Sequence, residues 1–137
     1  MSENSVIYDE SFDLTIFNFA EEIAVSKPPL RMREQYFLNP TANVIMNFND
    51  AGISALSVKD LGAFVSKLID DNTTSDRKHV VLVSNVEFEQ ILFTALIALE
   101  ELEPHGNVSF SATASVDNAR DCFRRLKQPG NSGSQHP

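Results

Sequence analysis

The sequence has one cysteine, no tryptophan and no apolar run long enough to cross a membrane. A single cysteine, Cys122, excludes an internal disulfide framework and a cysteine-based zinc site. A domain of 137 residues buries enough apolar surface to fold without either. The longest apolar run, residues 91–99, falls short of the roughly 20 residues that a membrane span needs. Because the N-terminus is acidic and lacks the apolar stretch of a signal peptide, we expect a cytoplasmic protein with no membrane insertion.

Basic residues are also scarce. Eleven Lys and Arg stand against 19 Asp and Glu, which gives a formal net charge of -8. Such a chain repels phosphate backbones, so we expect no nucleic-acid partner. The charges are unevenly spread: residues 1–26 and 86–106 contain acidic residues and no Lys or Arg, whereas the basic residues gather at 27–33 and 120–127. This asymmetry favours oriented contacts with a protein partner.

The residue patterns that usually carry chemistry are missing. The three histidines, His79, His105 and His136, share no metal-ligand spacing and pair with no cysteine. There is no Gly-x-Ser-x-Gly elbow, and the five glycines form no phosphate-binding loop. Cys122 lies in a segment rich in arginine, which lowers a thiol pKa, but a half-buried, unreactive helix cysteine is the simpler interpretation. We therefore expect a protein that is not an enzyme, with no cofactor and no metal.

Alternating apolar runs and amphipathic segments predict the fold class. Strands are expected at 6–8, 12–19, 43–48, 78–84 and 108–110, and helices at 30–38, 58–68, 87–102 and 116–127. The order β-β-α-β-α-β-α-β-α predicts an α/β domain with a small mixed sheet of about five strands and helices mainly on one face. We expect one domain at 1–127 and a disordered Gly-, Ser- and Pro-rich tail at 128–137. How residues 20–42 pack is left open.

The stretches NVIMNFNDAGIS at 43–54 and DNARDCFRRL at 117–126, together with the element order, resemble the STAS domain of anti-sigma factor antagonists and its SpoIIAA-like relatives. The resemblance spans roughly residues 5–127. It implies a phosphorylated serine at the start of a helix, here Ser54 or Ser57, where the helix N-terminus favours a phosphate. The alternative is that Ser57 is a helix N-cap, since Asp60 follows three residues later.

The segment 87–102 carries more apolar residues than one helix face holds. With successive helix residues about 100° apart, one set of apolar residues shares a face that we expect to meet the core: Phe88, Ile91, Leu92, Ala95, Ala98, Leu99 and Leu102. Phe93 and Ile97 point nearly the opposite way, with Leu96 at the border and Glu89 and Glu100 flanking them. This second patch is expected to meet a second subunit, a protein partner or an apolar ligand, unless residues 20–42 fold over it.

Three functions follow from these patterns. The first is a non-catalytic regulatory domain of STAS type that binds a protein partner or forms a homodimer. The alternative is a carrier or binder of an apolar small molecule or lipid, as in the lipid-binding domains related to the STAS fold, with the ten phenylalanines lining a pocket. An enzyme of unrecognised type comes third, because no nucleophile, base and orienting group can be assembled from the sequence.

Overall fold

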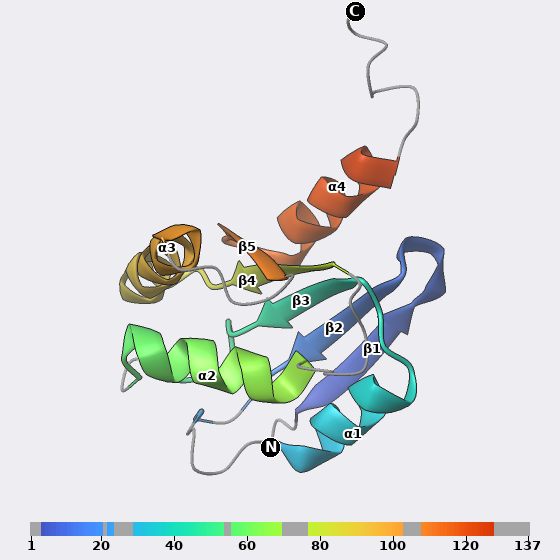
Figure 1. The fold of residues 1–137 in the computed structure, drawn as a ribbon, viewed down its shortest axis with the longest axis horizontal. Coiled ribbons are helices and arrows are strands. Elements are labelled where there is room, and N and C mark those ends of the chain that lie inside the picture. The colour runs from blue at the N-terminus through green and yellow to red at the C-terminus, as the bar shows by residue number, and fades with distance from the viewer. Residues whose placement is uncertain are drawn as a thin grey trace, which may run out of the picture.

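The computed structural model describes residues 4–20, 22–23, 29–53, 56–69, 77–102 and 108–127. Five strands form one sheet: β1 (Ser5–Asp9), β2 (Leu14–Asn18), β3 (Asn43–Asn47), β4 (Lys78–Val83) and β5 (Val108–Thr113). The strands lie side by side in chain order (Figure 1). β1 is antiparallel to β2, and β2 to β5 are parallel. The sheet is therefore mixed, as the sequence predicts.

Four helices cover this sheet unequally. α1 (Leu30–Leu38), α2 (Val58–Ile69) and α3 (Glu87–Leu102) pack on one face, and α4 (Val116–Lys127) packs alone on the other (Figure 1). The predicted fold class, an α/β sheet with helices mainly on one face, is confirmed. The predicted tail at 128–137 lies outside the described residues. None of the described helices combines the length and the apolar character that crossing a membrane requires.

The central strands are buried on both faces, which explains their unbroken apolar runs. In β3, Val44 and Met46 belong to the core beneath α1, α2 and α3, whereas Ile45 belongs to the core beneath α4. Successive side chains of a strand point to opposite faces, so a strand covered on both sides has no polar alternation. In β4, Val80 and Val81 divide between the two cores in the same way.

The hairpin between β1 and β2 differs from the sequence expectation. A strand was expected from residue 12, but a single 3-10 turn, η1 (Glu10–Phe12), comes first, and β2 begins at Leu14. Asp13 ends this turn in the left-handed conformation with φ 49°, which aspartate adopts more readily than most residues. Its carboxylate accepts a hydrogen bond from the Ala42 backbone N–H at 2.9 Å. The turn therefore also anchors the chain just before β3.

The described part of residues 20–42 packs on the face of the sheet that α2 and α3 also cover. Helix α1 occupies the predicted range 30–38 and buries Met32 and Tyr36. The backbone N–H of Ile23 donates to the carbonyl of Gly52 at 2.9 Å, and the Ile23 side chain joins the same core. These residues lie against the loop after β3 and against α2, so this segment completes the main core.

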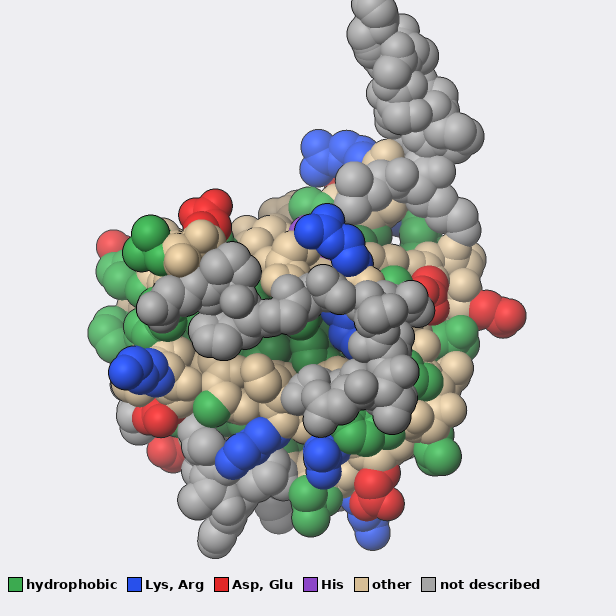
Figure 2. Space-filling view, in the orientation of Figure 1, with side chains coloured by type: hydrophobic (Ala, Val, Ile, Leu, Met, Phe, Trp, Pro, Cys, Tyr) green, Lys and Arg blue, Asp and Glu red, His purple; other side chains and the backbone are tan. Residues whose placement is uncertain are grey.

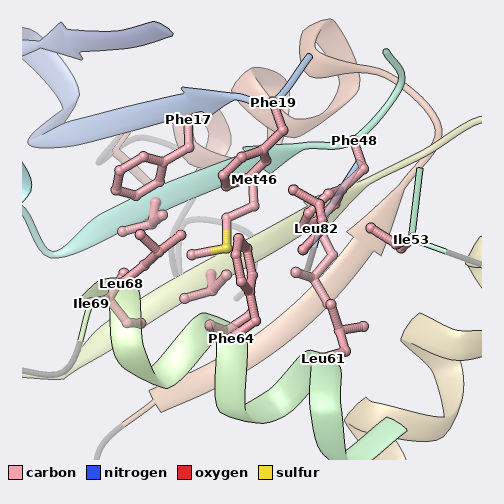
Figure 3. Packing of buried hydrophobic residues seen from close by; sticks show 14 of the residues in the cluster. Phe17, Phe19, Met46, Phe48, Ile53, Leu61, Phe64, Leu68, Ile69 and Leu82 are labelled. Atoms are coloured by element: carbon pink, nitrogen blue, oxygen red, sulfur yellow. The ribbon is translucent and has the colours of Figure 1, made fainter. Parts of the chain in front are cut away.

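Aromatic rings in contact with one another occupy the main core. The ring of Phe19 lies 4.9 Å from that of Phe48 and 5.4 Å from that of Phe64, centroid to centroid. Figure 3 shows these rings converging from the sheet side and from α2, with Met46 beside them. Phe93 of α3 continues the cluster at 5.8 Å from Phe48. These phenylalanines pack against one another, and the binding of an apolar ligand stays a prediction.

The smaller core beneath α4 contains a half-buried histidine. The His79 ring meets Phe123 of α4 edge-on at 5.6 Å. Its Nδ1 lies 2.8 Å from the Ser109 hydroxyl and its Nε2 lies 3.3 Å from that of Ser111. Burial lowers the pKa of His79 from its ordinary value of 6.5, because the imidazolium loses hydration under the helix. The folded protein therefore prefers neutral His79.

This preference predicts how stability depends on pH. The unfolded chain takes up a proton on His79 near pH 6.5, and the folded chain does so only at lower pH, so unfolding binds more protons in between. The free energy of unfolding should fall as pH drops from neutral through this window. Urea unfolding of the wild type and of His79→Gln across that range measures the effect. An identical pH dependence in both proteins would contradict it.

Candidate functional site

Helix α3 follows β4 and is tied to its end by a buried polar pair. The Ser84 hydroxyl donates to Oε1 of Glu89 at 2.6 Å and accepts from the backbone N–H of Val86 at 3.0 Å. Glu89 is only 4% exposed, and its place in the first helical turn suits a carboxylate. The carboxamide of Gln90 also donates to the Ser84 carbonyl at 2.9 Å. These bonds fix how α3 leaves the sheet.

One side of α3 is turned inward. Its buried residues are Glu89, Leu92, Phe93 and Leu96. Phe93 contacts Phe48, and Leu96 lies above Gly62 of α2, where an added Cβ would stand 3.2 Å from the leucine. Glycine at this position lets the two helices approach closely. The inward side of α3 is therefore set by contacts to both the sheet and α2.

The opposite side of α3 carries a second apolar stripe that faces solvent. Phe88 is 50% exposed, Ile91 60% and Leu102 80%, and between them Ala98 is exposed and Ala95 half-buried. The steps between these five residues are three, four, three and four, the spacing of a and d positions in a coiled coil. We call them the α3 seam. Figure 2 shows hydrophobic side chains gathered at the left-hand edge of the molecule, over α3.

The structure largely reverses the two faces that the sequence suggested for this helix, although Leu92 of the predicted core side is buried as expected. Phe93 and Leu96, expected on an interaction face, are 0% and 1% exposed and lie in the core. Glu89, expected to flank that face, is buried, and Ile97 and Glu100 are half-buried. The cover that Phe93 receives includes Phe48 at the end of β3. The reversal arises because both stripes are apolar, so the pattern alone does not show which of them meets the sheet.

The carboxyl ends of the parallel strands, where α/β proteins commonly bind ligands, hold a polar cluster. Its described members bond to one another. The Asn49 carboxamide accepts from the Asn85 backbone N–H at 2.7 Å, and the Asn47 carboxamide donates to that of Asn18 at 2.9 Å. Together with the pair of Ser84 and Glu89, these bonds hold the loops that leave the sheet.

A buried lysine at the amino ends of the strands had no signal in the sequence pattern. Lys78 is 6% exposed, and its Nζ donates to the Tyr36 hydroxyl at 2.7 Å and to the Thr41 carbonyl at 3.2 Å. The Tyr36 hydroxyl donates to the same carbonyl at 2.6 Å. These contacts join the end of α1 to the starts of β3 and β4.

Of the two serines that the STAS resemblance suggests as phosphorylation sites, the structure describes only one. Ser54 lies outside the described residues. Ser57 precedes α2, where its hydroxyl accepts from the backbone N–H of Asp60 at 3.1 Å and the Asp60 carboxylate accepts from the backbone N–H of Ser57 at 3.4 Å. This reciprocal pair is a capping box. The N-cap interpretation of Ser57 is confirmed, and its phosphorylation stays a prediction.

No cluster of metal-ligand side chains is found in the described ranges. Cys122 is a free, half-buried thiol on α4, and neighbouring cations are engaged elsewhere: Arg120 lies 3.4 Å from Asp9, and Arg124 lies 2.6 Å from Asp121. His105 and His136 lie outside the described residues. Of the surfaces described, the α3 seam is the strongest candidate for a functional site.

Comparisons with protein-family models, with curated proteins and with solved structures found no match to this chain.

The two faces of α3 predict opposite outcomes for the same substitution. Phe93→Ala should lower the free energy of unfolding by about 3–5 kcal/mol, because it leaves a cavity against Phe48. Phe88→Ala, on the half-exposed seam, should cost about 1 kcal/mol or less. Urea denaturation of both variants measures the difference. Equal losses would contradict this assignment of the faces.

The capping box predicts that removing its serine hydroxyl lowers the stability of the protein. Ser57→Ala removes the hydroxyl that accepts from Asp60, and should lower the free energy of unfolding by about 1 kcal/mol. Ser66→Ala, at an exposed site within the same helix, is the matched control and should leave stability unchanged or slightly raised. Thermal unfolding of both variants checks this. A loss no larger at Ser57 than at Ser66 would speak against the cap.

Proposed function

We propose that this protein is a non-catalytic interaction domain that docks a partner on the α3 seam. The observation that carries the proposal is the seam itself: Phe88, Ile91 and Leu102 stand largely exposed on one helix, in line and at heptad spacing. Contiguous exposed apolar patches on otherwise well-packed domains mark interaction sites. The seam spans about 21 Å, the length of a four-turn helix contact.

The energetics agree with a docking role. Burying an exposed Phe, Ile or Leu side chain contributes about 1.5–3 kcal/mol when burial is complete. Each of the three anchors contributes in proportion to its exposed share, so a helix laid along α3 gains apolar contact from all of them. Phe88, Ile91 and Leu102 belong to neither hydrophobic core of the described residues, whereas the opposite side of the helix packs against Phe48 and Gly62.

The regulatory aspect of the proposal comes from the resemblance of the element order to the STAS domain. The mixed sheet, with two antiparallel strands followed by three strand-helix units, supports it only at the level of fold class. Phosphorylation of Ser57 would add negative charge to the exposed start of α2. Such a change of charge is compatible with a regulatory interaction domain.

The docking proposal predicts a loss of binding from one exposed substitution. Helical peptides selected from a displayed library on the immobilised full chain supply the ligand, and titration calorimetry measures its affinity. Ile91→Glu should weaken binding at least about tenfold, because it buries an unpaired carboxylate in the contact. The fold should remain intact, since Ile91 is 60% exposed.

Leu38→Glu is the matched control. Leu38 is an exposed apolar residue, 86% accessible, at the end of α1 and away from the seam. Its substitution should leave the affinity unchanged. The docking proposal fails if both variants bind as the wild type does, or if both lose affinity equally.

A further inference from the structure

The charges beside the α3 seam follow the same heptad as its apolar residues. With Phe88, Ala95 and Leu102 at a positions, the preceding g positions are Glu87, Thr94 and Glu101. All three g residues are exposed. The helix contains no Lys or Arg at any position. One flank of the seam is therefore polar and acidic at both ends.

The other flank is not available for charge pairing. The e positions that follow Ile91 and Ala98 are Leu92, which is 8% exposed, and Leu99, which is half-buried. The fold closes this side of the seam, so within α3 itself a docked helix would meet charge along the g flank. Residues at g and e set partner choice and direction in helix pairs.

A second copy of this chain fits the flank poorly. In an antiparallel pair, g positions face each other, so Glu87 of one copy would lie beside Glu101 of the other. In a parallel pair, g faces e, so Glu87 would lie against Leu92. Neither direction gives the glutamates a cation, and the antiparallel one opposes like charges. The charges thus favour a different chain carrying Lys or Arg.

The shape of the seam adds a second requirement. Ala95 and Ala98 occupy its middle, between the large side chains Phe88 and Ile91 at one end and Leu102 at the other. We call the place of these two alanines the hollow, because small residues between large ones leave room for a bulky side chain of a facing helix.

We infer that the partner presents an amphipathic helix of about four turns, with Lys or Arg along one edge of its apolar stripe and a bulky apolar residue at its centre. The inference rests on the proposed docking at the α3 seam, and it names the chemistry of the occupant. The cations lie against Glu87 and Glu101, and the central side chain lies over Ala95 and Ala98.

Two synthetic peptides test the charge requirement. Both are helices of about 18 residues with the same leucine seam, and one carries Lys and the other Glu at the flanking positions. Titrated into the full chain, the Lys peptide should bind at least about tenfold more tightly, and added salt should weaken it. The double variant Glu87→Lys with Glu101→Lys should reverse the preference. Both sites are exposed, so circular dichroism should show an unchanged fold.

A third peptide tests the hollow. It matches the Lys peptide but has alanine at its centre. Ala98→Leu fills the hollow, so it should weaken binding of the leucine-centred peptide about tenfold and spare the alanine-centred one. Equal effects on both peptides would overturn the shape requirement.

The outcomes separate this inference from the docking proposal. If both charged peptides bind equally and Ile91→Glu abolishes both, the seam docks helices and the charge requirement is overturned. If light scattering shows a stable homodimer that Ile91→Glu dissolves, the occupant is a second copy and the inference is wrong. If neither peptide binds and Ile91→Glu changes no association, the docking proposal itself fails.

Discussion

The contact between the Phe93 and Phe48 rings decides which side of α3 meets solvent. It joins the middle of the helix to the end of β3, deep in the aromatic core. Two further contacts lie along the same side of the helix: Glu89 accepts from Ser84 near its start, and Leu96 packs over Gly62 beyond its middle. Three attachments spaced over two turns allow a helix no free rotation about its axis. The exposure of the α3 seam is a consequence of these contacts.

An apolar seam exposed to water can make two copies of the chain associate, and the acidic flank of the α3 seam opposes this association. Exposed side chains such as Ile91 and Leu102 promote association of any two copies that meet. Glutamates at both ends of one flank, Glu87 and Glu101, oppose that association in the antiparallel direction. The same charges would attract the basic helix that we propose as the partner and speed its encounter. A single arrangement would thus disfavour self-association and favour that partner.

The order of elements was predictable because each central strand is a short apolar run and each later helix repeats its apolar residues at helical spacing. The faces of α3 were not, because its two stripes lie roughly 140° apart and both contain large apolar residues. They are separated by contacts to distant parts of the chain, such as those of Phe93 with Phe48 and of Leu96 with Gly62. The turn at Asp13 was missed for a similar reason: its bond to Ala42 spans 29 residues. Lys78 gave no signal, since a strand-end lysine usually faces solvent.

Buried polar groups hold the described fold together at both ends of the sheet. At the amino ends of the strands, Lys78 bonds to Tyr36 and the Thr41 carbonyl. At the carboxyl ends, where ligand sites form in related architectures, Ser84 and Glu89 bond to each other. These described polar groups are used to hold helices and loops to the sheet. The exposed seam residues lie outside both described cores, which is why we propose that a partner covers them.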